Sequence, residues 1–351
     1  MSKNPFIGLR PYKTSENESF HGREKEVESI LSIIQKNKLV FLTGPSGSGK
    51  TSIINAGIIP RLRNGFTGQS GSRWSICKFR PGISPVSNLS FSLSNGELVL
   101  DKKPQTNDFR NYRNTILEIQ DLSIGKIYKD SEISNKKNLL IIIDQLEDLF
   151  IFKNLVKNDE LSEDVLLLNI VSRTIRLFDC SVYFLISLKT EFLKTLSSYT
   201  NIQQILTNSQ YPIQNIGADG ILKIVNKTFT RQNIIIDNSL LEDIINKTTR
   251  NIGLLPNLQV MFQSFFESFE SPSTITIENS SKIGDIDNVI NKKLNIFHDN
   301  LNENDQIFFE CLIKSLFNIE NSDIYSDFRS IKEILDCTDK SHKYFDNFFN
   351  K

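Results

Sequence analysis

The feature that most constrains this chain is the stretch Gly44-Pro-Ser-Gly-Ser-Gly-Lys-Thr51, which fits the spacing G-x-x-x-x-G-K-[ST]. A short apolar run over 39–43 precedes it. A helical pattern over 51–59 follows it and is expected to end near Pro60. Glycines let successive backbone N–H groups point into one concavity, and the helix N-terminus adds positive potential there. The stretch therefore predicts a loop that binds nucleotide phosphates, rather than a flexible Gly/Ser loop.

This loop contains most of the predicted binding residues. Lys50 would reach the β- and γ-phosphates and is also a catalytic candidate, and the Thr51 hydroxyl would be a ligand of Mg²⁺. Because the chain has no N-K-x-D motif that reads guanine, ATP or ADP is the expected nucleotide. The residues expected to bind this cofactor are Gly44, Pro45, Ser46, Gly47, Ser48, Gly49, Lys50, Thr51 and Ser52.

A second apolar run, over 139–143, is typical of a parallel strand that is covered on both faces. Asp144 follows it, and an acid at the end of such a strand can hold Mg²⁺ beside the phosphate loop. The next position is Gln145, so Glu147 and Asp148 are the first further acids and are candidate catalytic residues. Glu147 could orient or deprotonate the attacking water if the chain turns sharply after the strand. Alternatively, both acids simply favour the first turn of a helix.

The composition of the chain argues against several classes of function. Lys plus Arg and Asp plus Glu are equal at 41 each, so there is no global electrostatic case for binding nucleic acid or a membrane, although a local basic patch stays open. No apolar run approaches the roughly 20 residues that span a bilayer, and no signal peptide is recognisable, so we expect a cytoplasmic protein. The four cysteines show no metal-ligand spacing and are expected to be reduced thiols.

The pattern along the chain predicts an α/β fold in which helices connect the strands of a parallel sheet with right-handed crossovers. Further strands are expected over 74–79 and 182–187. Helices are expected over 24–36, 86–94, 108–122 and 161–178. After residue 217 only helices are expected, over 221–230, 240–249, 254–269, 285–298, 302–317 and 328–350.

Several short motifs in a fixed order carry a resemblance to a known family. They lie at 4–11, 20–24, 44–51, 74–82, 143–150, 188–193, 211–214 and 253–256. Their order and spacing resemble the STAND class of signal-transduction ATPases, specifically the novel STAND NTPase 1 family, over most of residues 4–270. The acids three and four residues past Asp144 also resemble the pattern of the related NACHT ATPases, which favours Glu147 as a catalytic residue.

The resemblance implies further nucleotide contacts. Gly22 and Arg23 would lie where the N-terminal segment passes the adenine and ribose, and Pro256 would contact the base. Lys189 stands at the end of the sensor strand, where the family usually has Arg. A lysine can contact a γ-phosphate but lacks the bidentate fork of arginine. The alternatives are a surface salt bridge for Arg23 and an ordinary first-turn helix residue for Pro256.

The resemblance also implies an organisation into parts. We expect an AAA-like P-loop NTPase with a parallel sheet, then a helical lid and a partial winged-helix-like segment. The boundaries are an N-terminal nucleotide-proximal segment at 1–24, the α/β domain at 25–216, the lid at 217–270, a linker at 271–284 and the winged-helix-like part at 285–351. The apolar helical pattern at 344–349 suggests the front part of a longer protein.

The implied function is a switch. Exchange of ADP for ATP, with slow hydrolysis, would open the domains and drive homo-oligomerisation in response to an unknown protein or ligand, in bacterial defence or regulation. Two alternatives stay open. One is a small-molecule kinase. The other is a DNA-associated AAA-type ATPase related to replication initiators, although acidic residues interleave the basic ones over 329–351.

Overall fold

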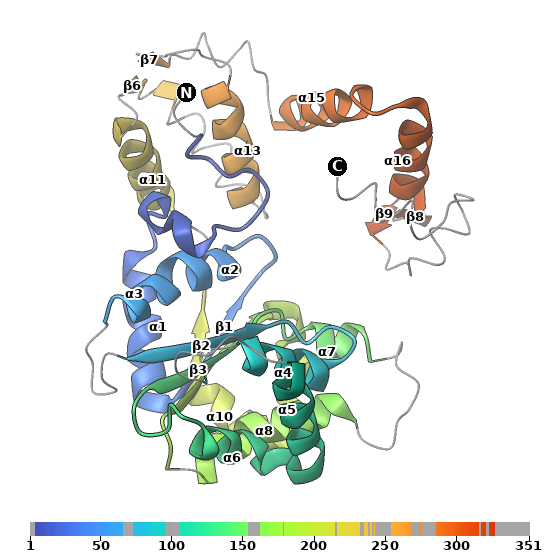
Figure 1. The fold of residues 1–351 in the computed structure, drawn as a ribbon. Helices are drawn as coiled ribbons and strands as arrows, with labels where there is room; N and C mark the ends of the chain where they lie inside the picture. Colours follow the sequence, from blue (N-terminus) through green and yellow to red (C-terminus); the bar gives the residue numbers. More distant parts are fainter. Residues whose placement is uncertain are drawn as a thin grey trace. The chain divides into compact units, whose positions relative to one another are not determined.

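The computed structural model (Figure 1) describes residues 4–65, 73–95, 98, 106–153, 162–177, 179–214, 216–231, 235–237, 239–240, 242, 254–267, 274–275, 286–315, 317–320 and 323–326. The chain divides into two compact units, Met1–Ser280 and Ser281–Lys351. The candidate site lies in the first unit.

The first unit is built on a five-stranded sheet of order β2-β3-β4-β1-β5, and all four pairings in it are parallel. The strands are β1 (Leu39–Gly44), β2 (Trp74–Phe79), β3 (Asn138–Ile143), β4 (Val182–Lys189) and β5 (Gln210–Pro212). The predictions for β1 to β4 are confirmed. β5 was not predicted, because three residues are too few to show a periodic pattern.

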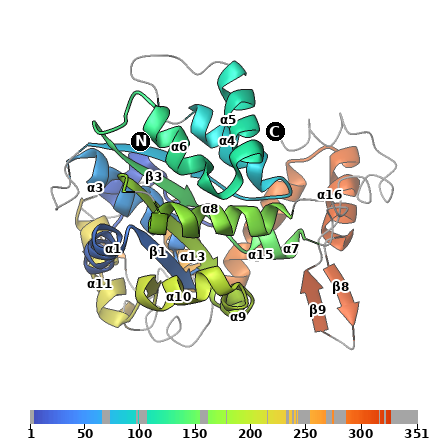
Figure 2. The ribbon, with the colours of Figure 1, turned by 90° about the horizontal axis from the view of Figure 1, so that it is seen from below.

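Helices cover both faces of the sheet, and β1 and β3 are buried throughout, as parallel strands usually are, whereas the edge strand β5 is partly exposed. Alternate strand residues enter two separate apolar clusters. One cluster includes α4 (Pro85–Asn95), α5 (Thr106–Ile119), α6 (Ser123–Asp130), α8 (Glu163–Leu177) and α10 (Thr200–Ser209). The other includes α1 (Glu24–Asn37) and the helix after the phosphate loop. Figures 1 and 2 show α4, α5, α6 and α8 gathered on one face.

The helix after the phosphate loop does not end near Pro60, so that prediction is wrong. It begins as α2 (Lys50–Ser52), widens into a π-helical segment (Ile53–Ile58) and continues as α3 (Ile59–Arg63). In the wide segment, the N–H of Ile59 donates to the carbonyl of Ile54, five residues back. In an ordinary α-helix the ring of Pro60 would clash with the carbonyl four residues back. We attribute the continuation of the helix past Pro60 to the wider π-helical turn, which moves that carbonyl away from the ring.

The expectation of helices alone after residue 217 is also wrong. α11 (Ala218–Arg231) and α13 (Leu254–Glu267) form as predicted, but β6 (Ile235–Ile236) pairs in parallel with β7 (Thr274–Ile275). In the second unit, α15 (Ile286–Asp299) and α16 (Glu303–Ser315) precede an antiparallel pair, β8 (Phe317–Glu320) and β9 (Asp323–Ser326). These strands are too short to show a clear alternation. The helices predicted over 240–249 and 328–350 lie mostly or wholly outside the described residues.

The remaining short helices are α7 (Asp148–Ile151) and α9 (Leu193–Ser197), and single turns of 3₁₀-helix lie at Gln120–Leu122 and Thr190–Phe192. A longer 3₁₀ segment, Thr14–Ser19, lies in the N-terminal part. Within the described ranges, no helix is both long enough and apolar enough to cross a membrane.

The N-terminal segment is fixed by an aromatic cluster to helices α11 and α13, the region for which a lid is expected. The Phe6 ring lies 5.2 Å from those of both Phe229 in α11 and Phe262 in α13. The backbone N–H of Ile7 donates to the Gln259 side chain of α13 at 3.2 Å. This segment therefore reaches the phosphate loop from the lid and can form a wall of any site between them.

Candidate nucleotide-binding site

The phosphate loop joins β1 to α2 at the carboxyl edge of the sheet. Gly47 and Gly49 have φ values of 74° and 90°, a region that side chains with a Cβ rarely adopt. The Lys50 ammonium donates to the carbonyls of Gly44 at 2.7 Å and Pro45 at 2.9 Å. Burial lowers the pKa of Lys50, although nearby carboxylates act in the opposite direction. The ammonium thus bonds to the loop itself and could exchange these carbonyls for phosphate oxygens.

Thr51 and Asp144 form the donor set that fits Mg²⁺. The Thr51 hydroxyl donates to Asp144 Oδ1 at 3.2 Å, and the Asp144 side chain is 1% exposed. Hydroxyl and carboxylate oxygens are the hard ligands that Mg²⁺ prefers, with waters and substrate phosphates completing its shell. In the described part of the chain, no group of three or more His, Cys, Asp or Glu side chains could hold a metal ion. The two residues could therefore hold Mg²⁺ in company with phosphates.

Two further residues contact Asp144. The Ser187 hydroxyl of β4 donates to Asp144 Oδ1 at 2.7 Å and accepts from the backbone N–H of Gln145 at 2.8 Å. The Lys78 ammonium of β2 lies 3.0 Å from Asp144 Oδ2. Sequence reasoning missed both: Ser187 lies just before the motif at 188–193, and Lys78 lies within the motif at 74–82 but was given no role. Their positions follow from the sheet, in which β2 and β4 are the neighbours of β3.

The chain turns sharply after Asp144, since Gln145 has a φ of 63°. The turn directs Glu147 to the cavity, where its Oε2 accepts from the Lys189 backbone N–H at 3.2 Å. Burial raises the pKa of Glu147, against the opposing effect of backbone hydrogen bonds and of Lys50 and Lys189. Asp148 begins α7 and accepts from the Gly82 N–H at 3.3 Å, and burial raises its pKa too. Asp148 does not line the cavity, whereas Glu147 does.

Arg23 ties the N-terminal segment to the phosphate loop. Its guanidinium donates to Glu26 at 2.6 Å, to the Gln214 carbonyl at 2.9 Å and to the Ser48 carbonyl at 3.2 Å. Arg23 therefore does form an ion pair, with Glu26, but its own side chain is only 3% exposed. The neighbouring Gly22 has a φ of 84°, so a larger residue there would be strained.

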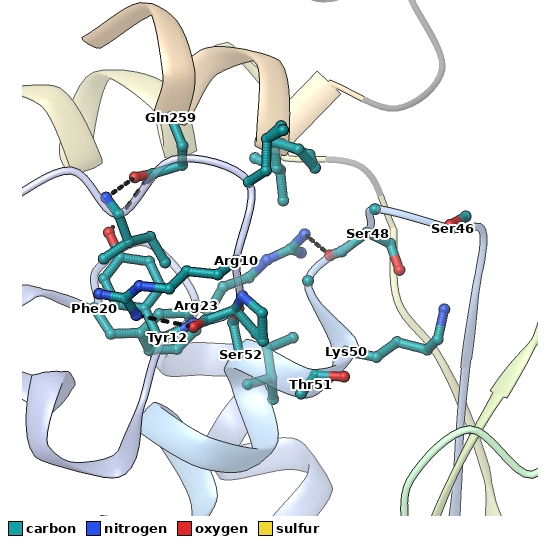
Figure 3. A pocket seen from close by; sticks show the side chains of 18 of the residues that line it. Arg10, Tyr12, Phe20, Arg23, Ser46, Ser48, Lys50, Thr51, Ser52 and Gln259 are labelled. Atoms are coloured by element: carbon teal, nitrogen blue, oxygen red, sulfur yellow. Dashed lines mark hydrogen bonds between the residues drawn. The ribbon is translucent and has the colours of Figure 1, made fainter. Parts of the chain in front are cut away.

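A cavity of about 280 Å³ lies over the loop, and its two ends differ in character (Figure 3). Lys50 and Thr51 lie at one end, and Tyr12, Phe20 and Gln259 at the other. Tyr12 and Phe20 meet edge to face with ring centres 5.5 Å apart, and Gln259 donates to the Tyr12 hydroxyl at 3.3 Å. Burial raises the pKa of Tyr12 to about 12, so its hydroxyl stays protonated at neutral pH. One end thus suits phosphates and the other an aromatic base.

The cavity gathers most of the predicted site residues. Its lining includes Arg23, Ser46, Gly47, Ser48, Gly49, Lys50, Thr51, Ser52, Glu147, Lys189 and Pro256. Gly22, Gly44, Pro45, Asp144 and Asp148 are not part of the lining. Of these, Gly44 and Pro45 bind the Lys50 ammonium and Asp144 binds Thr51.

Other lining residues were missed. They are Ile7, Gly8, Leu9, Arg10, Pro11, Tyr12, Phe20, His21, Ile53, Arg80, Gln145, Ile216, Ile224, Leu255 and Gln259. Most of them lie within the motifs at 4–11, 20–24, 74–82, 143–150 and 253–256 but were given no role, and two had a further signal. Gln259 follows Pro256 by three residues, the spacing of one helix face. Arg80 follows β2 at the edge where Asp144 follows β3.

A family model described as novel STAND NTPase 1 matches residues 5–350 of the chain. The chain belongs to this family. The novel STAND NTPase 1 chain is therefore a nucleotide-binding P-loop NTPase, as the motifs predicted. A comparison with curated proteins gives no match.

Solved structures with a similar fold agree with this assignment. One is the ORC2 protein of Aeropyrum pernix in ADPNP–ADP complexes, with a TM-score of 0.53, 12% identity, and coverage of 99% of this chain and 88% of that one. Another is Drosophila ORC bound to DNA, with a TM-score of 0.51, 11% identity, and coverage of 85% and 69%. At these identities the likeness shows the P-loop NTPase fold alone.

The buried carboxyl of Glu147 generates a prediction about stability. A carboxyl whose pKa is raised in the folded state stabilises the fold below its unfolded pKa, and this contribution is lost as pH rises through the folded pKa. Glu147→Gln should therefore unfold at higher urea concentration than wild type at pH 7–8 without nucleotide. The difference should shrink as pH falls below the usual value of 4.5. Glu118→Gln, on the exposed face of α5, is the control and should change little. If Glu147→Gln were less stable than wild type at neutral pH, the raised pKa of Glu147 in the folded state would be contradicted.

Proposed function

We propose that this chain binds an adenine nucleotide with Mg²⁺ and works as a switch. Exchange of ADP for ATP and slow hydrolysis would control domain opening and homo-oligomerisation. The observation that carries the proposal is the cavity, whose walls come from three separate parts of the chain. The three parts that matter here are the N-terminal segment, the phosphate loop and helix α13, and the strand ends and α11 contribute further lining residues. A nucleotide there would bridge the sheet domain and the lid.

The two ends of the cavity support one orientation of the nucleotide. The phosphates would lie over the loop, and the base would lie between the N-terminal aromatic rings and Pro256 of α13. His21 lines the cavity, and its Nε2 is buried without a hydrogen-bond partner in the described part of the chain. Burial lowers the pKa of His21, which favours the neutral ring. A neutral imidazole can donate to, or accept from, a purine edge.

A switch needs a ligand whose affinity differs between the two arrangements. ADP and ATP differ in the γ-phosphate, and three cationic residues line the cavity beside the strand ends: Lys50, Arg80 and Lys189. The described contacts between lid and sheet domain include an exposed pair, Lys227 of α11 with Glu24 of α1, at 3.1 Å. Exposed pairs contribute little. A bias of a few kcal/mol from the γ-phosphate would therefore suffice to change the dominant state.

Hydrolysis would use Glu147 to position or deprotonate the attacking water. Its carboxylate lies in the cavity, next to the Lys189 backbone, and its raised pKa suits a general base. Thr51 and Asp144 would hold Mg²⁺, which neutralises charge on the phosphates when bound. Lys50 would release the loop carbonyls and bind phosphate oxygens.

The first prediction tests the binding site. Lys50→Ala removes a charge-assisted contact to phosphate, and each such contact contributes about 1.5–3 kcal/mol. Affinity for ATP, measured by calorimetry, should fall at least about tenfold. Lys126→Ala on α6, which removes an exposed lysine paired with Asp130, is the matched control. Unchanged affinity in Lys50→Ala would rule out the phosphate site.

A second prediction separates binding from turnover. Glu147→Gln keeps the side-chain shape but loses the base, so it should bind ATP normally and cleave it at least about 10²-fold more slowly. Asp144→Ala should lose magnesium-dependent hydrolysis because the metal loses its anchor. Single-turnover measurements with quenched samples give both rates. If Glu147→Gln cleaved ATP at the wild-type rate, Glu147 would not be catalytic and would only favour the first turn of the helix.

A third prediction concerns the switch itself. Small-angle scattering of the full chain with ADP, and with a non-hydrolysable ATP analogue plus Mg²⁺, should give different radii of gyration or different masses. The reason is that only the analogue offers a γ-phosphate to the cationic end of the cavity. Lys50→Ala should reduce the difference. Identical profiles with both ligands shown to be bound would support a static binding module instead.

A DNA-associated ATPase is the second candidate. It is favoured by the names of the two similar structures, ORC2 of Aeropyrum pernix and Drosophila ORC bound to DNA. The two functions differ in their response to DNA. ATP hydrolysis that is strongly stimulated by duplex DNA would favour this candidate, and a rate independent of DNA would favour the switch.

A further inference from the structure

Lys78 is a partly buried lysine at the carboxyl edge of the sheet, and the proposed mechanism gives it no role. It lies in β2, one residue before the end of the strand, in register with Ile142 of β3. Its side chain is 28% exposed, and its ammonium lies 3.0 Å from Asp144 Oδ2. The same ammonium donates to Asn55 Oδ1 at 2.6 Å. Two protein oxygens therefore fix its position beside the candidate metal ligand.

The contacts of the Asp144 carboxylate are divided between its two oxygens. Oδ1 accepts from the hydroxyls of Thr51 and Ser187, and Oδ2 meets the Lys78 ammonium. Oδ1, next to Thr51, is therefore the oxygen placed to serve a metal at the phosphate loop. Oδ2 is neutralised by a cation that belongs to the protein. A buried carboxylate needs such a partner, because an unpaired charge in this position would be costly.

We propose that Lys78 is a positioning residue for Asp144 that also makes Mg²⁺ binding depend on the nucleotide. The inference rests on the proposed binding of nucleotide and Mg²⁺. The Lys78 cation holds the carboxylate with Oδ1 toward Thr51, and its charge repels a second cation at the same group. Asp144 alone then attracts Mg²⁺ weakly, and the metal binds only when phosphate oxygens complete its shell.

Asn55 connects this pair to the N-terminal wall of the cavity. Its Oδ1 accepts from Lys78, and its Nδ2 donates to the Tyr12 carbonyl at 2.9 Å. Tyr12 in turn accepts from Gln259 of the lid. Asn55 therefore acts on the metal ligand through Lys78. Its substitution should have a smaller effect in the same direction, and that effect should vanish once Lys78 is replaced.

The test measures metal binding directly, without relying on hydrolysis. The full chain is loaded with ADP in chelator, freed of metal and titrated with Mn²⁺, and electron paramagnetic resonance reports the free ion. Lys78→Met should bind Mn²⁺ at least about threefold more tightly than wild type, because the repelling charge is gone. Lys78→Arg keeps the charge and should match wild type. Lys126→Met, which removes a lysine paired with Asp130 on α6, is the control and should also match.

A second measurement distinguishes positioning from a general electrostatic effect. At saturating Mg²⁺, Lys78→Met should hydrolyse ATP more slowly than wild type although it reaches half-saturation at lower Mg²⁺. If Lys78→Met fails to fold, Lys78→Gln also removes the positive charge and can be measured in its place. Asn55→Ala, alone and combined with either variant, completes the double-mutant cycle.

The outcomes separate this inference from the proposed function. If wild type binds ADP and Mn²⁺, and the neutral variants bind Mn²⁺ equally or more weakly, the role of Lys78 is overturned and the switch stands. If wild type binds no ADP, the proposed function fails and this inference fails with it. Tighter Mn²⁺ binding in the neutral variants, restored to wild type by Lys78→Arg, supports it.

Discussion

The parallel pairing of β1, β3 and β4 is the constraint on which the site depends. In this register Gly44 lies opposite Lys189, and Ile143 lies opposite Ile186, so the carboxyl ends of the strands meet at one edge. The phosphate loop, Asp144 and Lys189 are far apart in sequence and reach the same edge for this reason. Residues beside these ends, such as Lys78 and Ser187, are brought to Asp144 by the same pairing. The chemistry of the edge therefore follows from the parallel pairing of largely apolar strands.

The edge concentrates buried charge, and the charges are paired across elements. Lys78 of β2 neutralises Asp144, and the Arg23 guanidinium meets Glu26 and two backbone carbonyls. Among the described residues Glu147 has a backbone N–H partner but no ion pair, and burial raises its pKa. A group held in an unfavourable state is common at functional sites, where stability is reduced for activity. This contrast distinguishes Glu147 from Asp144, and Asp148, whose pKa burial also raises, does not line the cavity.

Sequence reasoning succeeded where residue types act locally and failed where contacts are distant. The Gly44–Thr51 stretch and Asp144 could be predicted, because glycine spacing and an acid after an apolar strand each have a direct physical meaning. The contacts of Tyr12 and Lys78 could not, since they depend on which segments fold together. The prediction that the helix ends near Pro60 failed for another reason. A π-helical turn lets the helix continue past a residue that ordinarily ends it. The strands at 317–320 and 323–326 were missed because four residues are too few to show a clear alternation.

The central claim is that one nucleotide contacts the N-terminal segment, the phosphate loop and the lid at the same time. Hydrogen–deuterium exchange of the full chain, with and without ADP and Mg²⁺, tests it most directly. Slower exchange is predicted together in three segments, 7–12, 44–53 and 254–259, because each contributes to the cavity wall. Protection confined to 44–53, with ADP shown to be bound, would contradict the account.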